Sequence, residues 1–147
     1  DVKASRGLGD VYKRQTRLIH EIHPNHPYRV SLELLIMSFY KKYQEAWDDQ
    51  DIGAMLELYH PDYKRVFHAK GIEQGLDDLE PMMSRWLIGT KRNKRRCLYE
   101  NEDIVVEHFI ADFQDGTTEA VLTVHLLKDG LLWRTETGST PIEKSKD

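Results

Sequence analysis

The chain has 147 residues, which suits one domain with a real hydrophobic core. Its net charge of −4 and pI near 6.0 argue against a general nucleic-acid binder, which needs a strongly basic surface. No apolar run approaches the roughly 20 residues of a bilayer helix, so we expect no membrane partner. Cys97 is the only cysteine, which excludes an intrachain disulfide and a multi-cysteine zinc site and makes a cytoplasmic location the expectation.

The beginning of the chain carries little folding information. Residues 1–15 have no hydrophobic period, and the tract GLGDVYKRQ resembles translated adaptor read-through, so we expect a non-native segment; a disordered natural segment is the alternative. Residues 16–30 contain three histidines, but two prolines oppose a regular helix there, so a linker or loose N-terminal segment is expected. The single domain is predicted over residues 31–142, followed by a disordered tail over residues 143–147.

Three helices are predicted in the first half of this domain. Ser31 is a plausible N-cap for a long helix whose apolar residues recur at three- and four-residue steps as far as Trp47. A cluster of aspartates interrupts the pattern, and a shorter helix capped by one of these acids is expected over residues 52–59. A third helix is expected over residues 77–87, where Pro81 is tolerable only because it lies near the first turn.

Strands are predicted between and after these helices. Residues 63–68 alternate in the manner of a short strand, and residues 94–100 are predicted to form another. The basic run KRNKRR, residues 91–96, allows two interpretations. It could be a phosphate or nucleic-acid patch. The run has no interleaved aromatic residues for stacking, and the net charge of the chain is negative, so a solvated loop leading into an edge strand is favoured.

The last third of the chain predicts a three-strand meander with a defined register. Two Asp-Gly pairs, at 115–116 and 129–130, join alternating runs and are strong signals for two-residue hairpin turns. Counting outward from these turns places five polar residues on one face, in the rows His108-Thr123-Glu136 and Val106-His125-Arg134. The other face is almost wholly apolar, so we expect another surface to pack against it and shield it from water. It carries Val105, Phe109, Phe113, Leu122, Val124, Leu126 and Trp133.

The order helix, helix, strand, helix and then antiparallel strands predicts an α+β fold with helices on one face of a curved sheet. The segments EAWDDQDIGAMLELYHPDYKRVFH, GIEQG and HLLKDGLLWRTETG resemble the SnoaL-like branch of the nuclear transport factor 2 (NTF2-like) superfamily. The resemblance covers roughly residues 30–142. It implies a homodimeric cone in which a curved antiparallel sheet packs on a long N-terminal helix and two shorter ones around an apolar pocket. Its members include cyclases, isomerases, dehydratases, hydrolases and plain binders.

Candidate site residues follow from the polar strand face and from this resemblance. We expect His108, His125, Glu136 and Arg134 to be catalytic, because a histidine in an apolar cavity can shuttle protons and Arg134 could stabilise an enolate or carboxylate. Substrate-binding residues are expected to be Tyr43, Trp47, His68 and Thr123. The alternative is that this polar strand face contacts solvent and does not line a pocket. A metal triad of His68, His108 and His125 is a weaker one, so no metal or other cofactor is expected.

Two functional classes stay open at this point. The first is a domain that binds a small, largely apolar molecule in the cone pocket and performs cofactor-independent general acid/base catalysis. The second is a non-catalytic ligand-binding or dimerisation module. In both classes the apolar outer face of the sheet is expected to form a homodimer.

Overall fold

The computed structural model describes residues 37–143. The predicted non-native segment, the histidine-containing linker, the N-cap Ser31 and tail residues 144–147 lie outside this range. The chain divides into two units, residues 1–42 and 43–147, which are considered separately. In the first unit, the Ser38 hydroxyl accepts a hydrogen bond from the Lys41 amide at 3.2 Å, as an N-cap does for α3 (Phe39–Asp48). Met37 and Ser38 are not helical, so the predicted continuous helix from residue 32 to residue 47 is wrong at this point.

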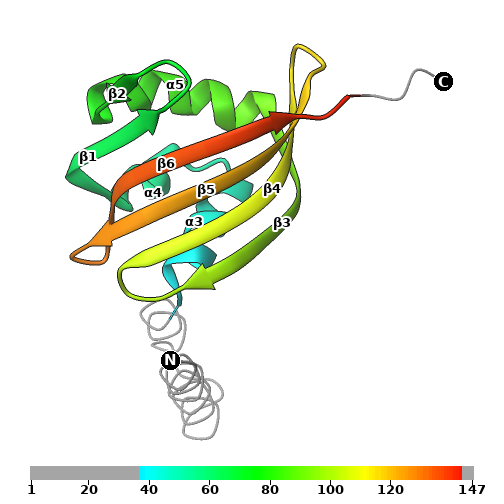
Figure 1. Cartoon of the computed structure of the whole chain (residues 1–147). Helices are drawn as coiled ribbons and strands as arrows, with labels where there is room; N and C mark the ends of the chain where they lie inside the picture. Colours follow the sequence, from blue (N-terminus) through cyan, green and yellow to red (C-terminus); the bar gives the residue numbers. More distant parts are fainter. Residues whose placement is uncertain (1–36, 144–147) are drawn as a thin grey trace, which may run out of the picture. The chain divides into compact units, whose positions relative to one another are not determined.

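The second unit is an α+β arrangement built on one six-stranded sheet. The sheet order is β2-β1-β6-β5-β4-β3, and neighbouring strands are antiparallel except β1 and β6, which are parallel. Figure 1 shows the curved sheet with the helices on one side of it, which confirms the predicted fold class. None of the helices in the described residues is long and apolar enough to cross a membrane. The remaining elements are α4 (Ile52–Glu57), α5 (Leu76–Gly89), β1 (Tyr59–Phe67), β2 (Ile72–Gln74), β3 (Thr90–Glu100), β4 (Ile104–Phe113), β5 (Thr118–Lys128) and β6 (Leu131–Pro141).

Two helices follow the sequence prediction closely. Asp51 caps α4, because its side chain accepts a hydrogen bond from the Ala54 amide at 3.0 Å. Helix α5 buries Leu79, Met83 and Leu87, which lie at the four-residue spacing of one helical face. Helix α4 ends at Glu57 and strand β1 begins at Tyr59, so the predicted helix is two residues too long and the predicted strand begins four residues too late.

The basic run 91–96 is not a loop. It lies inside β3, which begins at Thr90 and pairs with β4 along most of its length. Strand alternation therefore turns some of its cationic side chains inward, and the Arg92 side chain is only 2% exposed. The sequence prediction of a solvated loop is wrong here, because a charged residue in an edge strand can be buried when the sheet supplies its counter-ion.

The first predicted hairpin register is also wrong by one residue. His108 pairs with Leu122, and Thr123 pairs with Glu107 instead. The cause is the loop, which has three residues: the Phe113 amide donates to the Thr117 carbonyl, and Gly116 takes the left-handed conformation at φ 84°. A change of one residue reverses the face of every side chain on one strand relative to the next.

The second hairpin has the predicted two-residue turn, with Asp129 at φ 54° and Gly130 at φ 73°. Leu127 pairs with Leu132 as expected. A register shift then leaves Trp133 without a partner on β5, so His125 pairs with Thr135 and not with Arg134. This β-bulge was not visible in the alternation of the sequence.

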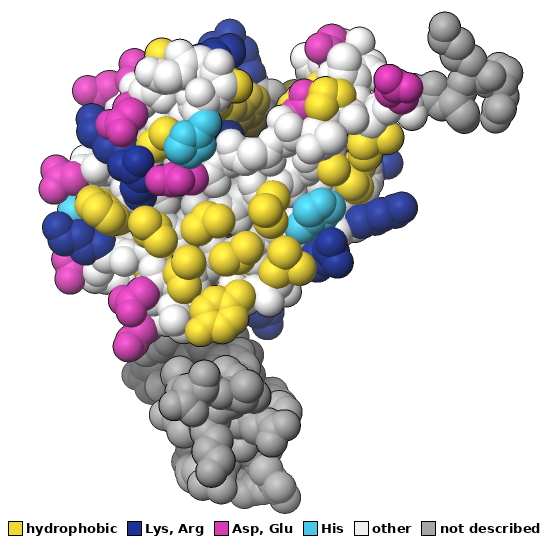
Figure 2. Space-filling view, in the orientation of Figure 1, with side chains coloured by type: hydrophobic (Ala, Val, Ile, Leu, Met, Phe, Trp, Pro, Cys, Tyr) yellow, Lys and Arg dark blue, Asp and Glu magenta, His cyan; other side chains and the backbone are white. Residues whose placement is uncertain are grey.

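The observed register defines two faces of the sheet. The inner face, toward the helices, carries Val105, Glu107, Thr123, His125 and Thr135, all of which are buried. The outer face carries opposed pairs on β4 and β5 that are apolar apart from one histidine: Ile104 with Leu126, Val106 with Val124, His108 with Leu122 and Ile110 with Ala120. Figure 2 shows hydrophobic side chains gathered over this outer face.

Candidate functional site

A cavity of about 660 Å³ lies between the inner face of the sheet and the helices of the second unit. Its wall is mainly aromatic and aliphatic, with a small number of polar side chains from the strands. Residues of α3 and α5 close one side. They are Tyr43, Trp47, Leu79, Met83 and Trp86. A concave, mostly apolar space of this size with few polar groups is typical of a small-molecule site.

A chain of buried polar residues crosses the cavity wall. Arg92 Nη2 donates to Glu107 Oε2 at 2.7 Å, and His125 Nε2 lies 3.1 Å from Glu107 Oε1. The other ring nitrogen of His125 lies 3.0 Å from the Thr135 hydroxyl. Gln44 of α3 donates a further hydrogen bond to Glu107 at 3.0 Å. Because four strands and one helix supply these groups, the backbone register holds them in place.

The protonation of this cluster follows from Glu107. Burial raises the pKa of its carboxyl group, but the hydrogen bond from His125 and the charge of Arg92 outweigh burial, and the net pKa is lowered. An ionised carboxylate only accepts hydrogen bonds, so Nε2 of His125 must carry the hydrogen that it donates to Glu107. In the neutral imidazole, Nδ1 then holds the lone pair and faces the Thr135 hydroxyl.

Aromatic rings enclose the charged groups. The Arg92 guanidinium lies over the rings of Phe109 at 4.2 Å and Trp47 at 4.5 Å, and the Tyr43 ring lies 5.2 Å from the His125 ring. Cation-π contacts of this kind offset part of the cost of removing a cation from water. The arrangement keeps water away from the ion pair, which strengthens its electrostatic interactions.

Three tyrosines add hydroxyl groups to the interior. The rings of Tyr59 and Tyr63 meet edge to face at 4.7 Å, and burial raises the pKa of Tyr43, Tyr59 and Tyr63. They are therefore neutral phenols at pH 7. The Tyr43 and Tyr59 side chains influence each other's pKa, as Thr135 does that of Tyr63, so polar groups continue along the cavity wall beyond His125.

The structure brings together only part of the predicted site. Tyr43, Trp47, Thr123 and His125 line the cavity. His68 and Glu136 also contribute to its wall, but they are exposed and pair with each other at 3.2 Å. Hydrogen bonds from Arg134 and His68 lower the pKa of Glu136.

His108 and Arg134 do not line the cavity. The observed register places both on the outer face, where His108 opposes Leu122 and Arg134 opposes Leu126. Their predicted grouping with His125 depended on two register errors, one at each hairpin. The proposed triad of His68, His108 and His125 does not form, and the described residues contain no group of three His, Cys, Asp or Glu side chains placed to hold a metal ion.

Sequence reasoning missed Glu107, which holds His125, and Arg92, which holds Glu107. Glu107 was assigned to the outer side of its strand by the register error, and Arg92 was assigned to a loop. A three-residue loop at 114–116, which the sequence Gln-Asp-Gly also allows, would have placed Glu107 opposite Thr123. The interruption of an apolar strand by one acid, in VVEHF, was the available signal.

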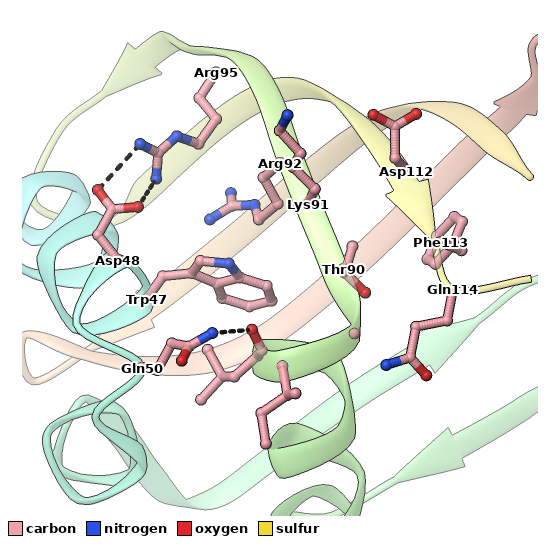
Figure 3. Close-up of a pocket in the computed structure, with 13 residues that line it drawn as sticks. Trp47, Asp48, Gln50, Thr90, Lys91, Arg92, Arg95, Asp112, Phe113 and Gln114 are labelled. Atoms are coloured by element: carbon pink, nitrogen blue, oxygen red, sulfur yellow. Dashed lines mark hydrogen bonds and ion pairs between the residues drawn. The ribbon is translucent and has the colours of Figure 1, made fainter. Parts of the chain in front are cut away.

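A second cavity of about 520 Å³ lies on the other side of Arg92. Figure 3 shows Arg95 paired with Asp48 in it and the Gln50 amide donating to the Leu87 carbonyl at 3.0 Å. Arg92 and Trp47 line both cavities and so separate them. Asp48 and Arg95 pair with each other here, whereas the chain of Arg92, Glu107 and His125 lies in the wall of the first cavity, which makes the first cavity the better candidate site.

Comparison with solved structures shows the fold. A steroid Δ-isomerase from Pseudomonas aeruginosa matches with a TM-score of 0.58 at 15% identity, over 71% of this chain and 78% of that one. An NTF2-like protein of unknown function from Cytophaga hutchinsonii matches with a TM-score of 0.58 at 12% identity, over 69% and 87%. IdmH of Streptomyces antibioticus, provisionally assigned as a polyketide cyclase, matches with a TM-score of 0.54 at 15% identity, over 69% and 88%.

The chain therefore has the NTF2-like fold, as the sequence resemblance predicted. No protein-family model and no curated protein matches the sequence. Folds of this kind support ligand binding and several reactions, so the function must be argued from the site itself.

Proposed function

We propose that this SnoaL-like domain binds a small, largely apolar molecule in the inner cavity and that His125 accepts a proton from it. The reaction would be a cofactor-independent proton transfer of the isomerase, cyclase, dehydratase or hydrolase type. The observation that carries the proposal is the buried Arg92-Glu107-His125-Thr135 chain in the wall of a cavity of about 660 Å³.

Glu107 gives His125 the properties of a general base. By accepting the Nε2 hydrogen it fixes the tautomer and stabilises the imidazolium that forms when Nδ1 takes up a proton. Arg92 keeps Glu107 ionised and so prevents the proton from passing to the carboxylate. The phenols of Tyr59 and Tyr63 supply neutral donors for an oxygen that becomes negative during the reaction.

One observation favours the alternative, a non-catalytic binding domain. Both ring nitrogens of His125 already have hydrogen-bond partners, so a substrate must take the place of Thr135 at Nδ1 or react through its hydroxyl. The two functions share ligand binding and differ in whether His125 is needed for turnover.

Ligand binding is tested with 2-naphthol, a flat neutral molecule that the cavity volume accommodates. Trp47 and Trp86 line the cavity, so a saturable change in tryptophan fluorescence is expected. Val121→Phe, which fills the cavity from the buried inner face, should weaken binding at least tenfold, whereas Val106→Phe on the outer face should not. Absence of saturable binding, or equal binding by both variants, would contradict the proposal.

We also propose that the outer face of the sheet joins a second copy of the chain. The eight opposed residues of β4 and β5 on this face include no carboxylate, lysine or arginine, and Leu122 and Trp133 are 45% and 36% exposed. A face without charge at its centre can pair with itself about a two-fold axis without like-charge contacts. Association would bury these side chains, which monomers do not usually leave exposed as one patch.

Solution mass measures this association. The wild-type protein should have the mass of a dimer by light scattering, and Leu122→Glu should give a monomer because it places two carboxylates in the interface. Ile88→Glu, at a 72% exposed position on α5, should remain dimeric. A monomeric wild-type protein would refute the outer-face dimer.

A further inference from the structure

Arg65 is a cation at the cavity wall with no counter-ion in the part of the chain that the structure describes. Its side chain extends from β1 into the cavity, where the guanidinium lies 4.0 Å from the centre of the Trp86 ring and 4.7 Å from that of Phe67. Among the described residues it forms no hydrogen bond or ion pair through its side chain, and Nε is buried without a partner. Stacking uses the faces of the guanidinium and leaves its in-plane N-H groups free.

The surrounding groups do not neutralise this charge. Tyr43, Tyr59 and Tyr63 lie close enough to influence Arg65, but their raised pKa values keep them uncharged. The two nearer carboxylates are engaged elsewhere, Glu107 with Arg92 and Glu136 with Arg134 and His68. Glu119 also lines the cavity, but it lies six residues along β5 from His125, about 20 Å at the rise of a strand.

Further unpaired polar atoms lie on the two strands that flank Arg65. Arg65 pairs with Gln74 on β2 and with Thr135 on β6, and Thr137 lies two residues after Thr135. Gln74 Oε1 and Thr137 Oγ1 are both buried without a partner in the described part of the chain. Buried polar atoms are nearly always hydrogen-bonded in a complete native structure. Three such atoms on adjacent strands mark a place for a polar group that residues 37–143 do not supply.

The sheet register relates this place to His125. Arg65 pairs with Thr135 on β6, and Thr135 pairs with His125 on β5, so the three residues form one row across the inner face. Neighbouring strands are about 4.8 Å apart, which puts the backbones of Arg65 and His125 about 10 Å from each other. One small molecule can therefore contact both side chains.

We propose that the ligand of this cavity is a carboxylic acid with an apolar body, whose carboxylate is held by Arg65 while the adjoining carbon framework lies beside His125. This inference rests on the proposed binding function. The planar fork of a guanidinium matches a carboxylate with two parallel hydrogen bonds, and the rings of Trp86 and Phe67 contact the guanidinium through its faces, which leaves this fork free. A single anionic group also compensates the half-buried positive charge of Arg65.

The test compares 2-naphthoate with 2-naphthamide, which share the same rings and differ in charge. Isothermal titration of the full chain should show 2-naphthoate binding at least tenfold more tightly than the amide. Arg65→Gln should remove this preference by weakening naphthoate binding at least tenfold, with amide binding unchanged within twofold. Arg65→Lys should keep part of the preference, because it retains the charge but loses the fork. Arg85→Gln, on the exposed face of α5, should behave as wild type.

Equal affinities for the two compounds in the wild-type protein would overturn the inference, as would unchanged naphthoate binding by Arg65→Gln. With either result, the proposed binding function still holds if 2-naphthol binds in the cavity. Failure of all three compounds to bind would reject the binding function together with the inference. Circular dichroism of Arg65→Gln verifies that any loss is measured on folded protein.

Discussion

Replacing Glu107 with glutamine is expected to lower the free energy of unfolding by about 3–5 kcal/mol, because it leaves the buried Arg92 without its carboxylate. The Arg92 and Glu107 side chains are each 2% exposed, so water cannot take the place of the lost charge. Urea unfolding followed by tryptophan fluorescence measures the change. Glu136→Gln is the matched control, since that carboxylate is exposed and its loss should change stability little.

A second variant separates lost charge from lost packing. Adding Arg92→Met to Glu107→Gln removes the uncompensated cation, so the double variant should be more stable than Glu107→Gln alone. The loss of unfolding free energy in the double variant could instead equal the sum of the losses in Arg92→Met and Glu107→Gln. That result would show that Arg92 and Glu107 are not energetically coupled.

The same pair makes stability depend on pH. The pKa of Glu107 is lowered in the folded protein from its ordinary value of 4.5, so its stabilising contribution is fully present above about pH 4.5 and is lost as the pH falls through the lower folded value. Wild-type protein should therefore lose stability more steeply below this pH than Glu107→Gln. Parallel curves for the two proteins would show that Glu107 is not the titrating group.

Replacing His125 with glutamine is expected to reduce proton abstraction by about 10²- to 10⁴-fold, the usual contribution of a positioned general base. The probe is 5-nitrobenzisoxazole, a flat molecule whose base-promoted ring opening releases a yellow nitrophenolate. Nδ1 of His125 is the basic atom that Glu107 directs along the cavity wall. His108→Gln should retain the wild-type rate, because His108 lies on the outer face.

Two outcomes of this assay separate the functional classes. Loss of turnover with retained 2-naphthol binding identifies His125 as the base. A wild-type rate no higher than that of His125→Gln, again with binding retained, supports the non-catalytic binding domain. Glu107→Gln should fall between wild type and His125→Gln if its role is to orient the imidazole.

The fold was predictable from the sequence because its signals are local. Asp51 as the cap of α4, the apolar spacing of α5 and the Asp129-Gly130 turn each follow from a few neighbouring residues. The grouping of strands then followed from element order and from the NTF2-like resemblance.

The site was only partly predictable because it depends on register, which small local choices decide. One extra loop residue before Thr117 moved Glu107 to the inner face and His108 to the outer one. A bulge at Trp133 exchanged Arg134 for Thr135 beside His125. The burial of Arg92 could not be read from a run of basic residues, because its partner Glu107 lies 15 positions away in the chain.

Imidazole NMR of the full chain shows whether a ligand binds inside the cavity against His125. In ¹⁵N-labelled protein, the ring signals of His125, assigned by their loss in His125→Gln, should shift progressively with added 2-naphthol while those of His108 stay in place. Shifts confined to His108, or a His125 signal unchanged at saturating 2-naphthol, would show that the ligand does not bind beside His125.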